Sequence, residues 1–129
     1  MEKVILCVDD EKIVTDTLIS QLRNELGEEY FFESASDAAE AWEIIEELVA
    51  DQLHIRLIIS DWLMPKVKGD KFLLEVFEQY PHIKLVMLSG QADEAAIKNL
   101  ENKIPDFKFL RKPWAKSELI ELVKSLLKN

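Results

Sequence analysis

The sequence contains a single cysteine, Cys7, and no long apolar run. One cysteine excludes an internal disulfide and provides no metal-binding spacing, so we expect a reducing compartment and a buried, apolar role for Cys7. The run 4–8 is too short for the apolar segment of a signal peptide, and no stretch approaches the roughly 18 residues of a membrane-spanning helix. We therefore expect a soluble, cytoplasmic protein without a membrane partner.

Basic residues are also scarce. Lys and Arg number 16 against 25 Asp and Glu, which gives a formal net charge of -9. Such an acidic field repels nucleic acid, so no direct nucleic-acid partner is expected, and any contact with DNA would need another domain or protein. The 129 residues suffice for one domain with one core, and the apolar content of 48% argues against disorder.

Short apolar runs alternate with longer amphipathic stretches along the chain. The runs predict strands at 4–8, 30–33, 55–60, 83–88 and 107–110, and the stretches predict helices at 11–26, 38–49, 70–80, 93–101 and 117–128. Gly27 is a suitable end for the first helix, and either Ser36 or Asp37 is a suitable cap for the second. This alternation predicts a single α/β domain over residues 1–129, with a parallel sheet covered by helices on both faces.

The spacing of apolar residues also predicts which side chains face the core. In the first helix Val14, Leu18 and Leu22 recur every four positions, with Ile13 and Leu26 beside them. In the second helix one face carries Ala38, Ala41, Trp42, Ile45, Leu48 and Val49. His54 and His82 lie away from the polar motifs described below, so we expect them to be exposed or in loops.

Polar side chains follow four of the predicted strands at the point where each strand ends. Asp9 and Asp10 follow the first strand, Asp61 the third, Ser89 the fourth and Lys112 the fifth. Because the carboxyl ends of parallel strands meet at one edge of the sheet, we expect these groups to converge there. Asp9 and Asp10 considered alone could instead be helix caps.

Three aspartates brought together repel one another, and a hard divalent cation relieves that repulsion. Mg²⁺ prefers one or two carboxylates and commonly completes its shell with phosphate oxygen, so the pattern favours a metal together with a phosphoryl group. Asp61 at the end of a buried strand is then a candidate nucleophile. Lys112 and Ser89 would supply a compact positive charge and a hydrogen-bond donor to the phosphoryl oxygens.

Four motifs carry a family resemblance, and they cover nearly the whole chain in the family's order. They are Val8-Asp9-Asp10-Glu11, then Ser60-Asp61-Trp62-Leu63-Met64-Pro65 with Gly69, then Leu88-Ser89-Gly90, and finally Leu110-Arg111-Lys112-Pro113. Together they resemble the receiver domain of two-component response regulators. The resemblance implies a doubly wound, flavodoxin-like sandwich of three layers with strand order 2-1-3-4-5.

The resemblance also implies a role for each residue at the predicted edge. Asp61 would accept a phosphoryl group from a phosphohistidine of a sensor kinase. Mg²⁺ would be held by Asp10 and Asp61 directly, by Asp9 through water, and by the backbone carbonyl of Leu63. Lys112 would pair with the phosphoryl group.

Further implied features concern conformation and partners. Lys112–Pro113 would be a cis peptide, and Ser89 and Phe109 would turn inward on phosphorylation. The surface of the fourth helix, fifth strand and fifth helix would then meet an output domain, another protein or a second copy of the chain. The implied donor is a sensor histidine kinase or a phosphotransfer protein. The protein would not be an enzyme beyond catalysing its own phosphorylation and dephosphorylation.

Several positions depart from the family pattern. Phe109 stands where Tyr is usual, so its rotation would be favoured by packing alone, and Ser89 stands where Thr is usual. An aromatic residue in a strand can also be plain core, which is the competing interpretation of Phe109. Residues 102–105 replace a turn of small residues, and 50–56 form a connection longer than the family needs.

Three other functions compete with this one. A phosphatase of the haloacid-dehalogenase type would need an acid two residues after the nucleophile, where this chain has Leu63. A flavodoxin-like cofactor binder would need a loop rich in glycine and hydroxyls after the first strand, where the chain has Asp9 and Asp10. A receiver that works only as a docking module, without phosphate, remains open from the sequence.

Overall fold

The computed structural model describes residues 2–91 and 93–128. Strands and helices alternate five times along the chain, as the sequence predicted. The elements are β1 (Lys3–Val8), α1 (Lys12–Leu26), β2 (Tyr30–Ala35), α2 (Ala38–Ala50), β3 (His54–Asp61), α3 (Gly69–Gln79), β4 (Lys84–Ser89), α4 (Glu94–Lys103), β5 (Lys108–Arg111) and α5 (Lys116–Leu127), with a 3₁₀ turn at Gly27–Glu29.

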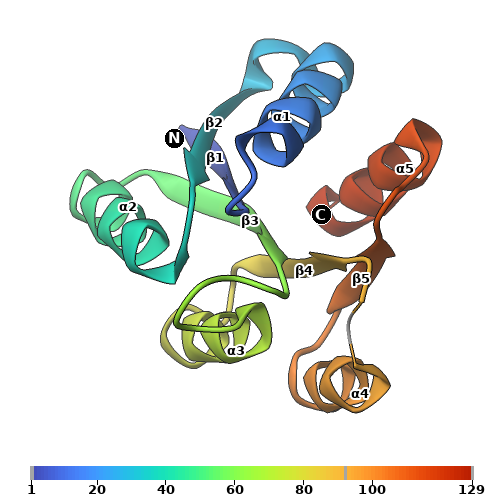
Figure 1. Cartoon of the computed structure of the whole chain (residues 1–129). Coiled ribbons are helices and arrows are strands. Elements are labelled where there is room, and N and C mark those ends of the chain that lie inside the picture. The colour runs from blue at the N-terminus through green and yellow to red at the C-terminus, as the bar shows by residue number, and fades with distance from the viewer. Residues whose placement is uncertain (1, 92, 129) are drawn as a thin grey trace.

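All neighbouring strands are parallel, and their order across the sheet is β2-β1-β3-β4-β5. The predicted fold class and strand order are therefore confirmed. Figure 1 shows α1 and α5 on one face of the sheet and α2, α3 and α4 on the other. Each crossover returns the chain to the same end of the sheet, so every strand has its carboxyl end at one edge.

The three central strands are buried on both faces, which explains why they read as continuous apolar runs. In β3, for example, Ile58 packs toward α2 and α3, whereas its neighbours Leu57 and Ile59 pack toward α1 and α5. Cys7 in β1 is fully buried, and burial raises the pKa of its thiol to about 12. This double packing holds the ends of β1, β3 and β4 in fixed positions.

Local signals set the ends of the helices. Asp37 caps α2 by accepting a hydrogen bond of 2.8 Å from the Glu40 backbone N–H, while Ser36 contacts the Glu40 side chain. The choice between Ser36 and Asp37 is thus settled in favour of Asp37. Gly27, with φ of +70°, ends α1 in a conformation that other residues rarely adopt.

Two residues expected near the core are exposed. Ile13 is 71% exposed, because it precedes Leu18 by five residues and so lies about 140° from it around α1. Val49 is 41% exposed and borders a cavity that is also lined by Leu53 and Ile55. Phe72 in α3 is fully buried and packs edge-on against Trp42 of α2.

The connection after α2 is shorter than the sequence suggested. Helix α2 ends at Ala50 and β3 begins at His54, with Gln52 in the left-handed region at φ of +63°. The apparent extra length lies in an irregularity of the β1–β3 pairing, where Val4 pairs with Ile55 and Ile5 with Leu57. The additional residue is therefore absorbed within the strand.

Candidate functional site

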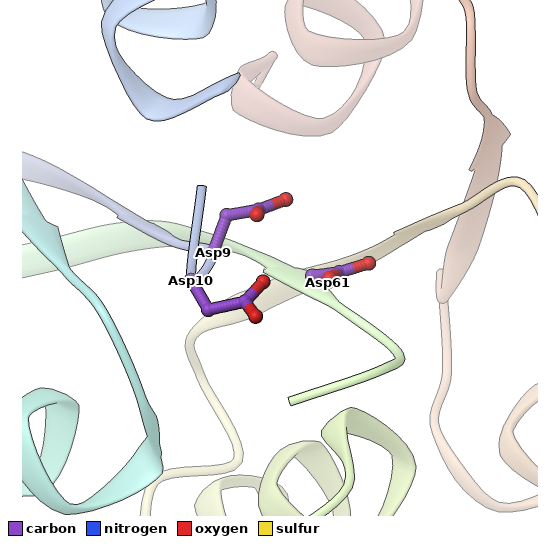
Figure 2. A group of neighbouring side chains, drawn as sticks. All are labelled: Asp9, Asp10 and Asp61. Atoms are coloured by element: carbon purple, nitrogen blue, oxygen red, sulfur yellow. The ribbon is translucent and has the colours of Figure 1, made fainter. Parts of the chain in front are cut away.

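The predicted polar groups meet at the carboxyl edge of the sheet. The register places Val8 beside Ser60, Asp61 beside Leu88, and Ser89 beside Arg111, so the strand ends are immediate neighbours. Asp9 and Asp61 are 2% and 5% exposed, although they are charged residue types. Figure 2 shows the side chains of Asp9 and Asp10, from the end of β1, beside that of Asp61 at the end of β3.

The three carboxylates form a cluster of hard oxygen donors. Asp9, Asp10 and Asp61 each offer an oxygen atom, and these atoms all lie within 4.8 Å of one another. Two of the three residues are buried and Asp10 is exposed, which leaves an approach from solvent. This donor set fits a cation such as Mg²⁺, which favours carboxylate and water oxygens.

Lys112 is the cation that the fold itself brings to the cluster. Its Nζ lies 2.8 Å from Asp9 Oδ2 and 3.3 Å from Asp61 Oδ1. The backbone supports this position, because the Lys112 N–H donates a hydrogen bond of 3.0 Å to the Ser89 carbonyl. The Lys112–Pro113 peptide is cis. The charge of Lys112 is therefore held between two buried carboxylates.

The cluster shifts the protonation of its members. The pKa of Asp61 is raised to about 6: burial is the largest cause, the charges of Asp9 and Asp10 also raise it, and Lys112 opposes them. Burial by itself lowers the pKa of Lys112, but its hydrogen bond to Asp9 and the carboxylate charges outweigh burial, and the net direction is upward. Near neutral pH the site holds an ammonium group and an Asp61 that is mostly ionised.

The loop after Asp61 closes against the strand that carries it. A Cβ atom on Gly69 would overlap the backbone carbonyl oxygen of Asp61, so only glycine fits this close approach. Gly69 N–H donates to the Trp62 carbonyl at 2.8 Å, and Ser60 Oγ donates to the Asp61 carbonyl at 3.0 Å. From the sequence, Gly69 was identified only as a member of a motif, and the Ser60 hydroxyl was given no role.

A cavity of about 360 Å³ opens at the carboxyl edge. Its lining residues are Asp10, Glu11, Asp61, Leu63, Ser89, Gly90, Gln91 and Lys112. Ser89 is 2% exposed, and its Oγ accepts a hydrogen bond of 3.0 Å from the Gln91 backbone N–H. The cavity is thus bordered by the candidate nucleophile, the ammonium and the hydroxyl.

Two predicted residues play other parts in this conformation. Asp9 accepts a hydrogen bond of 2.8 Å from the Glu11 backbone N–H, so it supports the start of α1 as well as the cluster. Phe109 does not line the cavity: it is partly buried against the core on the α2, α3 and α4 side. The Arg111 guanidinium lies 5.6 Å from the centre of the Phe109 ring.

Comparison with known proteins gives the family. Residues 5–124 match the model of the response regulator receiver domain. The receiver domain protein (CheY-like) of Methanospirillum hungatei JF-1 superposes with a TM-score of 0.84 at 28% identity, covering 98% of this chain and 94% of that one. The receiver domain of NtrX from Brucella abortus gives 0.81 at 26% identity, covering 97% and 98% of the two chains.

Curated relatives agree with the structural ones. The chain is 32% identical over 125 residues to the sensor kinase CckA of Brucella abortus, and 32% identical over 123 residues to the hydrogenase transcriptional regulatory protein HoxA of Cupriavidus necator. These matches cover 97% and 95% of this chain but only 12% and 24% of the relatives. The chain thus spans a quarter or less of these proteins.

The chain belongs to the response regulator receiver domain family. Members of this family are signalling modules of response regulators, and phosphorylation is their standard chemistry. No helix within residues 2–91 and 93–128 is long and apolar enough to cross a membrane.

Proposed function

We propose that the protein is a cytoplasmic receiver domain in which Asp61 accepts a phosphoryl group from a phosphohistidine. The observation that carries this proposal is the position of Asp61: buried, at a strand end, with its Oδ1 3.3 Å from Lys112 Nζ and its carboxylate beside those of Asp9 and Asp10. A nucleophilic carboxylate, a fixed ammonium and a cation site are the components that phosphoryl transfer requires.

Mg²⁺ held by Asp10 and Asp61, with Asp9 behind them and the Leu63 carbonyl as a further ligand, would supply charge neutralisation for the incoming phosphoryl group. Asp61, with a pKa of about 6, is available as the carboxylate above that pH. Its oxygen attacks phosphorus while the bond to the donor nitrogen breaks. Lys112 then turns its ammonium from the carboxylates to the new phosphoryl oxygens.

The added phosphoryl charge would shift the balance between two conformers. Ser89 Oγ, which now accepts from the Gln91 N–H, would donate to a phosphoryl oxygen instead. Movement of Ser89 would draw the loop after β4 inward and give Phe109 room to follow. The surface of α4, β5 and α5 would change and meet an output domain, a target protein or a second copy.

The partners and the reverse reaction belong to the same proposal. A sensor histidine kinase or a phosphotransfer protein is the expected donor, in keeping with the kinases among the relatives. The domain would catalyse its own phosphorylation, and loss of phosphate to water would end the signal. Residues 1–129 would act as one receiver unit, whether alone or within a longer protein.

The test uses intact mass and tryptophan fluorescence. With Mg²⁺ and acetyl phosphate, the wild-type protein should gain one phosphoryl group, and Asp61→Asn should gain none. Asp16→Asn is the matched control, because Asp16 lies on the exposed side of α1 in an ion pair with Lys12. Modification that persists in Asp61→Asn would contradict the proposed acceptor. A folded wild-type protein that neither reacts nor binds beryllofluoride would favour a phosphate-independent docking module.

The conformational part has its own test. Hydrogen exchange should slow or quicken in α4, β5 and α5 when beryllofluoride and Mg²⁺ are added, while the amides of β1 and β3 stay unchanged. Equal exchange of the α4–β5–α5 surface with and without the mimic would contradict the proposed switch.

A further inference from the structure

The two histidines of the chain meet at the amino edge of the sheet, opposite the aspartate cluster. His54 is the first residue of β3, and His82 lies just before β4. Their ring centres are 6.4 Å apart, with a tilt of 38° between the ring planes. A chain with only two imidazoles therefore places them side by side.

A cavity of about 370 Å³ lies beside the two rings. It is lined by Val49, Gln52, Leu53, His54, Ile55, Tyr80, His82 and Ile83. Tyr80 stands edge-on to His82, with ring centres 6.4 Å apart. The imidazoles thus stand at an open space with an apolar floor, and not in a packed interior.

The backbone of His54 and of the residue after His82 is hydrogen-bonded, whereas the two imidazoles have no such partner among the described residues. His54 N–H donates a hydrogen bond of 2.9 Å to the Glu2 carbonyl, and Ile83 N–H next to His82 donates one of 3.1 Å to the Tyr80 carbonyl. Both side chains are exposed, and within the described residues neither imidazole has a hydrogen-bond or ion-pair partner. Their nitrogen atoms are therefore open to a ligand from solution.

We propose that His54 and His82 form a binding site for a divalent transition-metal ion, with Zn²⁺ as the reference ion. Neutral imidazole is the commonest protein ligand for zinc, copper and nickel. With zinc–nitrogen bonds of about 2.0–2.1 Å, an ion between two imidazoles holds their ring centres at most about 6.5 Å apart. The observed 6.4 Å lies within that limit, and rotation of the exposed side chains brings the rings to the closer spacing of a tetrahedral site.

The site differs in chemistry from the aspartate cluster at the other edge. Carboxylate oxygens select hard ions such as Mg²⁺, whereas imidazole nitrogens select the softer transition metals. Water, or a small ligand seated in the cavity, would complete the coordination. The ion would join the amino ends of β3 and β4, the two strands whose carboxyl ends carry Asp61 and Ser89.

The experiment titrates the whole protein with Zn²⁺ while the aspartate edge is occupied by excess Mg²⁺. Because the chain has two histidines, their imidazole resonances are directly assigned by the single variants His54→Gln and His82→Gln. Both resonances should shift together at one equivalent of Zn²⁺. Each variant should weaken binding by about tenfold or more, a scale that even outer-shell partners reach at metal sites.

Controls separate this site from the other edge and from general surface binding. Gln52→Ala changes a cavity residue without an imidazole and should leave the affinity unchanged. Asp61→Asn should also leave it unchanged, which makes the result independent of the proposed phosphoryl chemistry. Cu²⁺ should bind more tightly than Zn²⁺. Zn²⁺ binding that survives loss of both histidines, or imidazole resonances that stay fixed up to millimolar Zn²⁺, would overturn the proposal.

Discussion

The polar side chains at the two ends of β3 differ in their burial. At the carboxyl end, Asp61 is buried beside two other carboxylates and a lysine. At the amino end, His54 is exposed, and its imidazole has no hydrogen-bond or ion-pair partner among the described residues. The same strand therefore joins a region where charges are crowded and desolvated to one where a polar side chain remains in water.

This difference teaches where stability has been given up for chemistry. Burial of like charges raises the free energy of the folded state. A sheet without carboxylates at its edge would not have this cost in stability. The buried core of β1, β3 and β4 supplies enough apolar packing to tolerate that strain. Changes at the carboxyl edge should consequently have large effects of either sign, while changes at the amino edge should have small ones.

The largest effect is expected for Gly69→Ala. Its new Cβ would overlap the Asp61 carbonyl, which is backbone and cannot move aside cheaply. We expect a loss of about 3 kcal/mol in the free energy of unfolding, at the upper end of overpacking effects, and a displaced Asp61. Chemical denaturation measures it. Gly90→Ala is the control, because a Cβ there meets Lys112 at 3.5 Å, an ordinary contact; equal losses in the two variants would contradict the assignment.

Asp61→Asn should stabilise the protein at neutral pH in the absence of divalent ions. The folded-state pKa of about 6 exceeds the ordinary value of 3.8, so the folded protein binds this proton more tightly than the unfolded chain. That contribution is complete below pH 3.8 and is lost as the pH rises through about 6. Because one pKa unit corresponds to about 1.4 kcal/mol, removing the charge should raise the free energy of unfolding at pH 8 by about 2–3 kcal/mol.

The pH profile provides the check on this sign. Denaturation of the wild type and Asp61→Asn should give converging stabilities toward pH 4 and a constant difference above pH 7. Added Mg²⁺ should stabilise the wild type and narrow the gap, because it binds only the folded site. If Asp61→Asn is less stable than the wild type at pH 8, the ionised Asp61 carboxylate does not destabilise the folded protein, and the prediction is wrong.

Lys112→Met should act in the opposite direction. Lys112 is the ammonium that offsets Asp9 and Asp61, at 2.8 Å and 3.3 Å. Its loss should lower the free energy of unfolding at pH 8 by about 1–2 kcal/mol and raise the pKa of Asp61 further. Lys116→Met, at an exposed position at the start of α5, should leave both unchanged. NMR of the side-chain carboxyl carbon of Asp61 measures the pKa. An Asp61 pKa that is unchanged in Lys112→Met would argue against the pairing of Lys112 with Asp61.

The smallest effect is expected at the amino edge. His82→Gln alters an exposed side chain and should change the free energy of unfolding by less than about 0.5 kcal/mol without added metal. Thermal and chemical denaturation in the presence of a chelator provide the measurement. A loss of unfolding free energy comparable with that of Lys112→Met would mean that the ring contact between His82 and Tyr80 stabilises the fold.

The sequence was sufficient for the fold and for the composition of the candidate site. Runs such as 55–60 are apolar because both faces of β3 are covered, and the alternation with helices leaves few other topologies. Asp9, Asp10, Asp61, Ser89 and Lys112 could be assigned to one edge because parallel strands all end there. Each of these inferences uses only order along the chain.

Features that depend on the path of the backbone could not be predicted in this way. The exposure of Ile13 depends on the rotation of α1 about its axis, which a stretch of apolar residues defines only loosely. The role of Gly69 depends on how closely the loop returns to Asp61. The meeting of His54 and His82 brings together the first residue of β3 and the segment before β4, which are distant in sequence and share no motif.

Cys7 has a practical consequence that follows from its place in the middle of the sheet. The thiolate form of cysteine attacks alkylating reagents, and a thiol with a pKa of about 12 within β1 provides almost no thiolate. The reagent can reach this sulfur only in molecules whose central sheet has opened. The rate of Cys7 alkylation therefore measures the opening of the central sheet without any added label. A second cysteine introduced on the surface would be modified long before Cys7, so a dye can be attached there selectively.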